Sequence, residues 1–386
     1  MKSLVIRAPL LTQSGYGTHS RQIFKWAKNS KMFSKVSLQP VPWGITSWLI
    51  SQSAENGLVG EIMEKATGDG NFDVSIQVQL PNEWDVNLAR FNVGITAAVE
   101  TDKCNPSWID ACNRMNAVIV PSSHTKNTLE KSGNLKVPVL VVPESYFEEI
   151  DEEVEENLDL NTSTNFNFLA VGQVTGHDPG SDRKNIFNLI KWFCEEFSED
   201  SDVGLILKTN SGRSTKIDKN ITRQLVEKIL NEVRKGPYPK VHLLHGSFTQ
   251  KEMAALYKHP SVKSLVTTTR GEGFGLPLLE AAASDLPVIA TNWSAHLDFL
   301  NKGKFIPLNY NLAPIYSGRV DNNIFMEGTR WAEVDEKDFK RKIRKFRKSP
   351  EIPKRWAEDL GEKIRNSYSQ KAINNEYEKV FCEILK

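Results

Sequence analysis

The feature that most constrains this chain is a rhythm of short, apolar, β-rich runs separated by longer segments with helical spacing. Runs that are apolar nearly throughout suit strands of a parallel sheet buried on both faces. Strands that alternate with helices form βαβ units. The rhythm predicts strands at Ser3–Pro9, Lys35–Val41, Asp73–Gln79, Phe91–Ala97, Ala117–Ser122, Val137–Val142, Phe166–Gly172, Val203–Thr209, Lys240–Gly246, Val262–Thr268, Pro287–Thr291 and Lys304–Leu308.

One segment interrupts this rhythm. Tyr146–Asn165 is acidic and ends in small polar residues, so it is interpreted as the connection between two domains. A length of 386 residues agrees with two domains. The predicted fold is α/β, with doubly wound Rossmann-like domains at residues 1–160 and 166–355. Residues 354–386 are typical of one helix, and its end, about 360–386, is expected to pack back on the first domain; its apolar stripe is Trp356, Leu360, Ile364, Tyr377, Phe381 and Leu385.

Composition narrows the classes of function. The net charge of +1 gives no global field that would attract nucleic acid or anionic lipid. The four cysteines are widely spaced and match no metal motif, which indicates reduced thiols of an intracellular protein. The apolar run at the start of the sequence is too short for a signal peptide. No run reaches the roughly 18 apolar residues that a membrane span needs. A cytoplasmic protein without an integral membrane segment is expected.

The first motif, Ser14–Ala27, follows the first predicted strand. Gly15 and Gly17 would allow a sharp turn and close approach of a ligand, with Thr18 or Ser20 as the helix cap. A helix N-terminus there would favour an anion. Ser20 occupies the third glycine position of the dinucleotide fingerprint, and no acidic residue ends the second strand. Both departures argue against the interpretation of the chain as a nicotinamide-dependent dehydrogenase. A simple tight turn is the alternative.

The second motif is a strand, loop and helix within Thr267–His296. Pro277 suits the first helical turn, and Gly273 and Gly275 keep side chains away from whatever meets the loop. The N–H groups of Phe274 to Leu276 would face an anion. Glu272 precedes the helix, whereas Glu280 lies about one turn inside it and would accept hydrogen bonds from a ribose diol. A helix cap plus a surface glutamate is the alternative.

The run "EGFGLPLLE" followed by "AAASDLPVIAT" resembles the signature of retaining nucleotide-sugar glycosyltransferases of the GT-B fold, family 4. The resemblance covers most of the second domain and extends to the first domain only in pattern. It implies two Rossmann-like domains that face a central cleft. It also implies that Glu280 holds the donor ribose, that Glu272 with the Phe274–Leu276 backbone holds sugar and phosphates, and that Lys184 meets the diphosphate.

Further roles follow from the same resemblance, with departures. The family often has an arginine where Gln173 stands, so Arg183 or Lys208 would compensate. Gly15 and Gly17 match the first-domain glycine loop. The family frequently places a first-domain histidine near the sugar; Glu100 is the polar candidate here, with His19 and His124 as alternatives. The predicted catalytic residues are Glu272, Lys184 and Glu100, and the predicted donor-binding residues are Gly15, Gly17, Gln173, Arg183, Lys184, Lys208, Arg270, Gly273, Phe274, Gly275, Leu276 and Glu280.

The implied reaction transfers a sugar, with retained configuration, from a nucleoside-diphosphate sugar to an acceptor hydroxyl. A UDP-sugar is the expected donor, and neither a cofactor nor a metal is expected. Glu199–Asp202 is interpreted as a solvated turn rather than a metal motif. An epimerase or hydrolase on the same scaffold and a non-catalytic sugar-nucleotide sensor are alternatives. No enzymic nucleophile is evident, so attack on the same face as the leaving phosphate is favoured.

The acceptor is expected to be a carbohydrate or modified DNA. Stretches such as "TNWSAHLDFL" also resemble glycosyltransferases of tailed phages, some of which act on hydroxymethylated bases; the location would then be the host cytoplasm. Lys337–Lys348 would contact a DNA backbone in that case. The alternative interpretation of this basic stretch is a solvated helix face with Phe339, Ile343 and Phe346 pointing inward.

Overall fold

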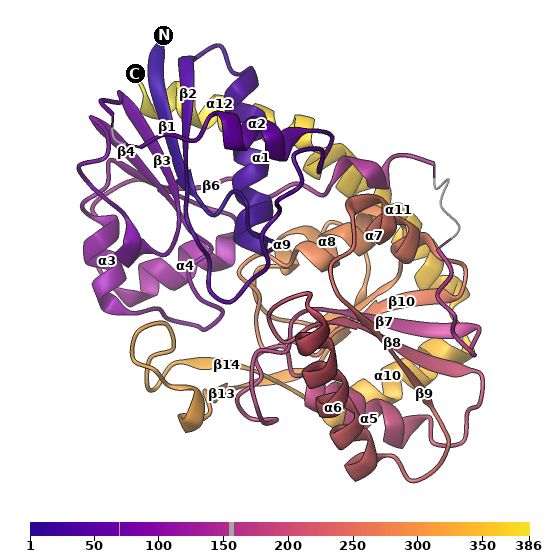
Figure 1. The fold of residues 1–386 in the computed structure, drawn as a ribbon. Coiled ribbons are helices and arrows are strands. Elements are labelled where there is room, and N and C mark those ends of the chain that lie inside the picture. Colours follow the sequence, from indigo (N-terminus) through magenta and orange to yellow (C-terminus); the bar gives the residue numbers. More distant parts are fainter. Residues whose placement is uncertain (69, 154–157) are drawn as a thin grey trace. The chain divides into compact units, whose positions relative to one another are not determined.

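The computed structural model describes residues 1–68, 70–153 and 158–386, so residues 154–157 of the predicted connection lie outside the described residues. The chain divides into two compact units (Figure 1). Unit 1 comprises Met1–Ser145, Asn322–Met326 and Tyr368–Lys386. Unit 2 comprises Tyr146–Asp321 and Glu327–Ser367. Each unit is built on one six-stranded sheet.

The sheet of unit 1 has the strand order β2-β1-β3-β4-β5-β6, and all its pairings are parallel. The direction in which strands are added reverses between β1 and β3. Its strands are β1 (Lys2–Ala8), β2 (Phe33–Pro40), β3 (Val74–Val78), β4 (Phe91–Ile95), β5 (Ala117–Val120) and β6 (Val139–Val141). Its helices are α1 (Gly15–Asn29), α2 (Leu58–Glu64), α3 (Pro106–Cys112), α4 (Ser123–Ser132) and α12 (Gln370–Ile384), with a 3-10 turn at Pro81–Glu83.

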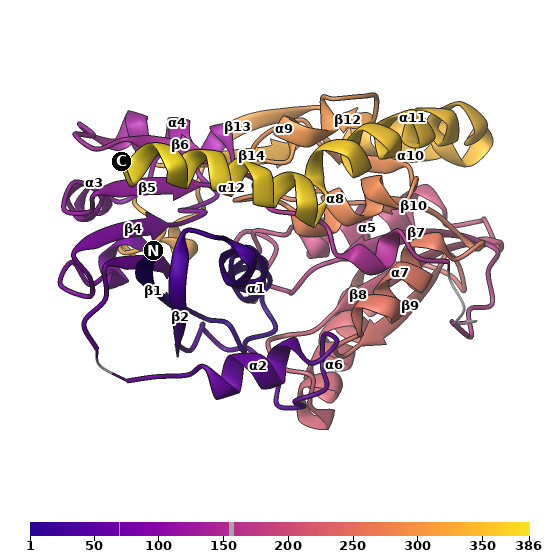
Figure 2. The ribbon, with the colours of Figure 1, turned by 90° about the horizontal axis from the view of Figure 1, so that it is seen from above.

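The C-terminal helix α12 packs on α1 within unit 1 (Figure 2). Trp26 stacks on Tyr377 with ring centroids 5.1 Å apart. The prediction of one helix over residues 354–386 is wrong, because α11 (Glu351–Tyr368) ends one residue before the cap of α12. The Ser369 side chain accepts a hydrogen bond from the Ala372 N–H, which starts a new helix.

The sheet of unit 2 has the order β12-β11-β10-β7-β8-β9 and is also parallel. Here the direction reverses between the neighbours β7 and β10. The strands are β7 (Phe166–Val171), β8 (Val203–Thr209), β9 (Lys240–His245), β10 (Val262–Val266), β11 (Val288–Thr291) and β12 (Ile306–Leu308). The helices are α5 (Ile186–Glu196), α6 (Lys216–Val233), α7 (Gln250–Lys258), α8 (Leu276–Ala283), α9 (Leu297–Leu300), α10 (Glu336–Lys348) and α11, with 3-10 turns at Glu148–Ile150 and Ser317–Arg319.

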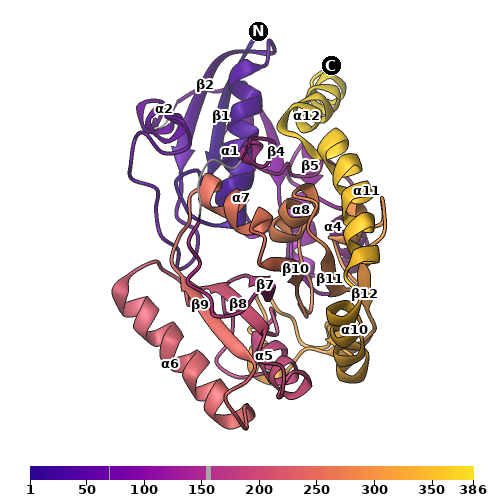
Figure 3. The same cartoon turned by 90° about the vertical axis from the view of Figure 1, so that its right-hand side faces the viewer.

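Helices cover both faces of the unit 2 sheet. Helices α5, α6 and α10 lie on one face, and α7 and α8 lie on the other (Figures 1 and 3). Aromatic side chains fill the first of these layers; Phe168 packs edge-on against Phe193 and Phe346 at 5.4 and 5.6 Å. All twelve predicted strands are present in the two sheets. Central strands such as β3, β5 and β8 are buried on both faces, as expected for parallel sheets covered by helices.

A two-stranded antiparallel hairpin, β13 (Tyr310–Pro314) with β14 (Arg330–Val334), adds to unit 2 and was not predicted. Its strands are mixed in polarity and so lack the continuous apolar runs of the parallel strands. The residues between them include Asn322–Met326, which are grouped with unit 1.

The basic stretch Lys337–Lys348 forms α10, and its inward stripe is confirmed: Phe339, Ile343 and Phe346 are all buried. Its cations face carboxylates of unit 2. Lys340 contacts Glu195, Arg344 contacts Glu196, Arg347 contacts Asp200 and Asp202, and Lys342 contacts Asp338. Much of the positive charge of this helix is therefore neutralised within the same unit.

The glycine loop of unit 1 begins α1 earlier than expected. The cap is Ser14, whose side chain accepts from the Gly17 N–H at 3.0 Å, rather than Thr18 or Ser20. A Cβ on Gly17 would lie 2.1 Å from the Thr12 carbonyl oxygen, whereas a Cβ on Gly15 would meet nothing within 4 Å. The two glycines therefore serve different purposes: Gly17 permits packing, and Gly15 leaves open space.

Gly17→Ala is expected to destabilise unit 1 by about 1–3 kcal/mol, because the added methyl group must displace backbone. Gly15→Ala is the matched control and is expected to be neutral or stabilising by up to about 1 kcal/mol. Chemical denaturation of both variants measures the two free energies. Equal stability of the two variants would show that the close approach at Gly17 does not constrain the fold.

Candidate functional site

Two loops of unit 2 leave neighbouring strands at the point where the strand order reverses. The loop of residues 172–185 follows β7, and the loop of residues 267–275 follows β10. They are hydrogen-bonded side by side: Asn185 and Thr268 exchange two bonds of 3.1 Å. The Arg270 N–H donates to the Arg183 carbonyl at 2.9 Å, and the Arg183 guanidinium donates to the Gly271 carbonyl at 2.7 Å. Ligands of doubly wound sheets bind at this reversal point.

The paired loops bring a carboxylate and two cations together. Lys184 Nζ lies 2.6 and 2.7 Å from the two carboxylate oxygens of Glu272. Arg183 Nη1 lies 3.6 Å from Glu272 Oε2. The three side chains are 16%, 13% and 7% exposed for Lys184, Arg183 and Glu272. This cluster holds a net positive charge close to a helix N-terminus, which suits a phosphorylated ligand.

The charge state of Glu272 follows from this environment. Burial opposes ionisation, but Lys184 and then Arg183 outweigh it and hold the pKa of Glu272 at about 2. The carboxylate is therefore ionised at neutral pH. Its backbone N–H donates to Ser294 Oγ at 2.9 Å, and Ser294 has a φ of 89°, a conformation that non-glycine residues adopt at a cost.

The helix after the second loop, α8, begins as expected. Its cap is Gly275 with a φ of 99°, a left-handed conformation that favours glycine, and Pro277 lies in the first turn. Gly273 and Leu276 are buried. The Phe274 ring turns into the core and packs on Phe299 at 5.4 Å, so its backbone and not its ring is left to face a ligand.

Glu280 is half-buried one turn into α8. The hydroxyl of Tyr257, on α7, donates to Glu280 Oε2 at 2.8 Å. Burial raises the pKa of Glu280 to about 7, although the Tyr257 hydrogen bond lowers it. Near neutral pH, Glu272 is therefore fully ionised, whereas Glu280 is divided between its protonated and ionised forms.

Lys208 and Gln173 occupy other positions along the same sheet edge. Lys208, near the end of β8, donates to the Gly246 carbonyl and lies over the Phe248 ring at 4.3 Å. Burial lowers the pKa of Lys208 to about 8. Gln173 is exposed just after β7. Neither side chain has a recorded contact with Glu272 among the described residues, whereas Arg183 does.

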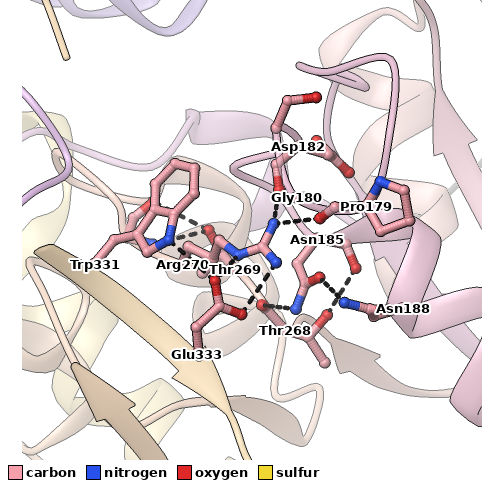
Figure 4. Close-up of polar contacts among 12 residues, drawn as sticks. Pro179, Gly180, Asp182, Asn185, Asn188, Thr268, Thr269, Arg270, Trp331 and Glu333 are labelled. Carbon is pink, nitrogen blue, oxygen red and sulfur yellow. Dashed lines mark hydrogen bonds and ion pairs between the residues drawn. The ribbon is translucent and has the colours of Figure 1, made fainter. Parts of the chain in front are cut away.

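Arg270 lies in the second loop, but its side chain turns away from Glu272. Its guanidinium contacts Glu333 on β14 and carbonyl groups of the first loop (Figure 4). Its predicted role as a donor-binding side chain therefore has no support in this geometry, because the guanidinium is already bonded to protein groups.

Three predicted site residues belong to unit 1. Gly15 and Gly17 lie in the first turn of α1, which follows the loop after β1. Strand β1 is one of the two strands between which the order of that sheet reverses. Glu100 follows β4 and raises the pKa of Tyr16 together with the dominant effect of burial, so the two residues lie within electrostatic reach. The alternative His19 is buried, its Nε2 is 2.9 Å from the Tyr377 hydroxyl, and burial lowers its pKa to about 3. His19 therefore fits a packing role.

Sequence reasoning missed several residues that shape the site. Asp182 is fully buried and accepts hydrogen bonds from the N–H groups of Thr175, Lys184 and Ile186, which fixes the first loop. Tyr257 and Glu333 were missed because their partners lie 23 and 63 residues away. Asp182 was missed although its partners are local, because it lies three residues before Asn185, the cap of α5, and so does not occupy the capping position.

The described part of the chain holds neither a metal-binding cluster nor a membrane-spanning helix. Residues 1–68, 70–153 and 158–386 contain no group of three or more His, Cys, Asp or Glu side chains arranged to hold a metal ion. Within the same ranges, no helix is both long and apolar enough to cross a bilayer.

The chain is thus an α/β protein with two doubly wound parallel sheets, and the sheet of unit 2 has two cations and a carboxylate at its reversal point. The comparisons with known proteins narrow this class. Residues 225–360 match the family described as glycosyl transferases group 1. A probable sucrose-phosphate synthase of Thermosipho melanesiensis is 31% identical over 127 residues, which are 32% of this chain and 27% of that protein.

Solved structures resemble nearly the whole chain. Sucrose-phosphate synthase of Thermosynechococcus elongatus has a TM-score of 0.63 at 12% identity, with 100% of this chain and 99% of that chain covered. HepE of Anabaena in complex with UDP and glucose has a TM-score of 0.63 at 12% identity, with 99% and 100% covered. These likenesses confirm the predicted GT-B fold class. The family match covers Glu272 and Glu280 and supports the predicted enzyme class, a glycosyltransferase.

Proposed function

We propose that this protein is a retaining glycosyltransferase that transfers a sugar from a nucleoside-diphosphate sugar to an acceptor hydroxyl, without a required metal. The observation that carries the proposal is the cluster of Lys184, Arg183 and Glu272 where the strand order of unit 2 reverses. A UDP-sugar is the favoured donor, since the structural neighbour HepE was solved with UDP and glucose. The family match over residues 225–360 supports the same class of reaction.

The cations of the cluster would stabilise the leaving diphosphate. Cleavage of the bond between sugar and diphosphate leaves additional negative charge on the phosphate, and fixed positive groups stabilise that charge. Lys184 is partly exposed, so its ammonium can contact a phosphate while Glu272 holds it in place. Gln173 stands where the family often has an arginine. Arg183 would supply this second cation, because its guanidinium lies beside the Glu272 carboxylate.

The two glutamates would bind different parts of the donor. Glu272 is ionised and lies in the loop, where it can accept hydrogen bonds from sugar hydroxyls and stabilise positive charge on the sugar ring. Glu280 would accept both hydroxyls of the ribose when it is ionised. Gly273, Gly275 and the backbone of Phe274 and Leu276 would contact the phosphates. Gly15, Gly17, Lys208 and Glu100 keep their predicted roles within this proposal.

Retention is proposed to occur by attack on the face that the phosphate leaves. A double displacement needs an enzymic nucleophile. Both oxygens of Glu272 already contact Lys184, so this carboxylate is better arranged to orient than to attack. The leaving phosphate would then accept the proton of the acceptor hydroxyl. Isolation of a sugar covalently attached to the protein would refute this step.

A carbohydrate is the favoured acceptor. Transfer to hydroxymethylated DNA is the alternative, and the ion pairs along α10 reduce the positive charge that this helix offers to a DNA backbone. An epimerase or hydrolase would convert the donor without an acceptor. The described residues supply no specific observation that favours either alternative.

The test is a donor and acceptor screen. UDP-, GDP- and ADP-sugars are incubated with the enzyme in the presence of EDTA, with no acceptor, with saccharides, or with hydroxymethylated duplex DNA. The expected result is release of UDP that depends on a saccharide, and a product whose anomeric configuration, read by proton NMR, equals that of the donor. Turnover without acceptor would establish a hydrolase or epimerase, and inverted product would refute retention.

A further inference from the structure

Arg270 is almost completely buried, with 3% of its surface exposed, and its guanidinium makes four hydrogen bonds (Figure 4). Nε and Nη2 donate to the two oxygens of Glu333 at 2.7 and 3.0 Å. Nη1 donates to the carbonyl groups of Pro179 and Asp182 at 2.8 and 2.6 Å. A buried arginine with this many partners is a fixed structural element, because each bond restricts its position.

These bonds join three segments that are far apart in the sequence. Arg270 belongs to the loop of Glu272, Pro179 and Asp182 belong to the loop of Lys184, and Glu333 belongs to β14. The backbone adds a further link, because the Ala332 N–H donates to the Arg270 carbonyl at 3.0 Å. The hairpin β13–β14 is thereby attached to both loops of the site.

A lysine could not replace this arrangement. The guanidinium plane presents donors in a fork that matches both oxygens of Glu333 while Nη1 reaches the two carbonyl groups. Trp331 reinforces the geometry, since its Nε1 donates to Glu333 Oε1 at 3.0 Å and its ring lies 5.1 Å from the guanidinium carbon. The Arg270 guanidinium is therefore held both by its hydrogen bonds to Glu333 and by its contact with the Trp331 ring.

We infer that Arg270 is a positioning residue for the donor site: it holds the loop of Arg183 and Lys184 against the loop of Glu272 and fixes both to β14. This inference deepens the proposed function and rests on it for its kinetic consequence. Arg270 itself does not touch the donor. Its effect is transmitted through the separation of the Lys184 ammonium and the Glu272 carboxylate, which is 2.6 Å when Arg270 is in place.

The test compares Arg270→Lys with Arg365→Lys. Arg365 is a matched control because it also bridges a carbonyl group and a carboxylate of unit 2, those of Ala283 and Asp285, at the far end of α8. Hydrogen exchange detected by mass spectrometry is measured for peptides covering residues 172–185, 267–275 and 330–334. Faster exchange in all three peptides is expected for Arg270→Lys, and no change in them for Arg365→Lys.

The kinetic arm measures donor turnover at saturating UDP-sugar and acceptor. A displaced cluster is expected to lower kcat by about tenfold to a hundredfold in Arg270→Lys, with a smaller change in the KM for the donor. Arg365→Lys is expected to keep wild-type kinetics. Glu333→Gln, which keeps one acceptor oxygen for Arg270, should show a smaller fall in kcat and serves if Arg270→Lys does not fold.

The two arms separate the two possible failures. Unchanged exchange in the three peptides of both Arg270→Lys and Glu333→Gln would overturn the positioning role, whatever the reaction is. Failure of the wild-type protein to bind UDP or to turn over any sugar donor would instead refute the proposed function. Changed exchange with wild-type kcat would also overturn the inference, because the loops would then move without consequence for the cluster.

Discussion

Replacement of Lys184 by methionine is expected to lower donor turnover by about a hundredfold to a thousandfold, the loss typical when one preorganised group that stabilises developing negative charge is removed. The reason is the position of its ammonium, 2.6 Å from Glu272 and only partly exposed at the point where the unit 2 strand order reverses. The measurement is kcat with a UDP-sugar at a temperature where the variant is folded.

The same substitution also affects stability, and the sign follows from Glu272. Its folded pKa of about 2 lies below the ordinary 4.5, because Lys184 and Arg183 outweigh the burial that opposes ionisation. The carboxylate therefore contributes stability that is present above pH 4.5 and is lost as pH falls towards 2. Without Lys184 this pKa rises, so Lys184→Met should lose more stability at pH 8 than at pH 5.

A double variant separates fold from chemistry. Lys184→Met with Glu272→Gln removes both charges and should regain stability relative to Lys184→Met, since an uncompensated buried charge is what destabilises the single variant. Turnover should stay low. Recovery of turnover in the double variant would show that Lys184 only neutralises Glu272.

Lys342→Met is the matched control for Lys184→Met. Lys342 is 17% exposed and pairs with Asp338 at 2.6 Å, which closely reproduces the burial and distance of the Lys184–Glu272 pair. It lies on α10, where no donor-site residue is proposed. Its loss should cost stability and leave kcat unchanged, so a comparable loss of kcat would show that the effect of Lys184→Met is not specific to the site.

The sequence predicts the parallel sheets well because their strands are apolar on both faces and need only local pattern to be recognised. Strands β13 and β14 escape this pattern because each is five residues long and mixes polar with apolar residues, so neither contains a continuous apolar run. The tail was predicted as one helix because its apolar stripe continues on both sides of Ser369, the cap of α12. A single serine does not mark a break in such a stripe.

The local structure of the candidate site was predictable where it lies within one loop. The order of Gly273, Gly275, Pro277 and Glu280 specifies a loop that enters a helix. The contacts of Arg270 were not predictable, because its partner Glu333 is 63 residues away and an arginine beside a glycine-rich loop is typical of a ligand contact. Only the fold shows whether such a cation already has a partner.

Glu280→Gln is expected to stabilise the protein at pH 8 while weakening donor binding. Burial raises the pKa of Glu280 from 4.5 to about 7. The folded protein therefore holds this proton over a range in which the unfolded chain has lost it, and stability falls as pH rises from 4.5 through 7. The cost of the ionised group above pH 7 is about 3 kcal/mol. Glutamine avoids it and still accepts the Tyr257 hydrogen bond.

Binding should show the opposite trend with pH. Ionised Glu280 can accept both ribose hydroxyls, so wild-type affinity for UDP is expected to rise from pH 6 to pH 8. Glu280→Gln should bind UDP about tenfold more weakly at pH 8, the effect of losing roughly 1.4 kcal/mol, and should lose most of this pH dependence. Calorimetric titration with UDP at several pH values measures both effects.

Tyr257→Phe supplies an independent check on the assignment. Removal of the hydroxyl that donates to Glu280 Oε2 removes the hydrogen bond that lowers the pKa of Glu280. The midpoint of the pH dependence of UDP binding should therefore move above 7. If Glu280→Gln binds UDP as tightly as wild type at pH 8, or if Tyr257→Phe leaves the midpoint in place, Glu280 is not the residue that holds the ribose. A stabilising Glu280→Gln with intact binding would make it a buried acid retained for another purpose.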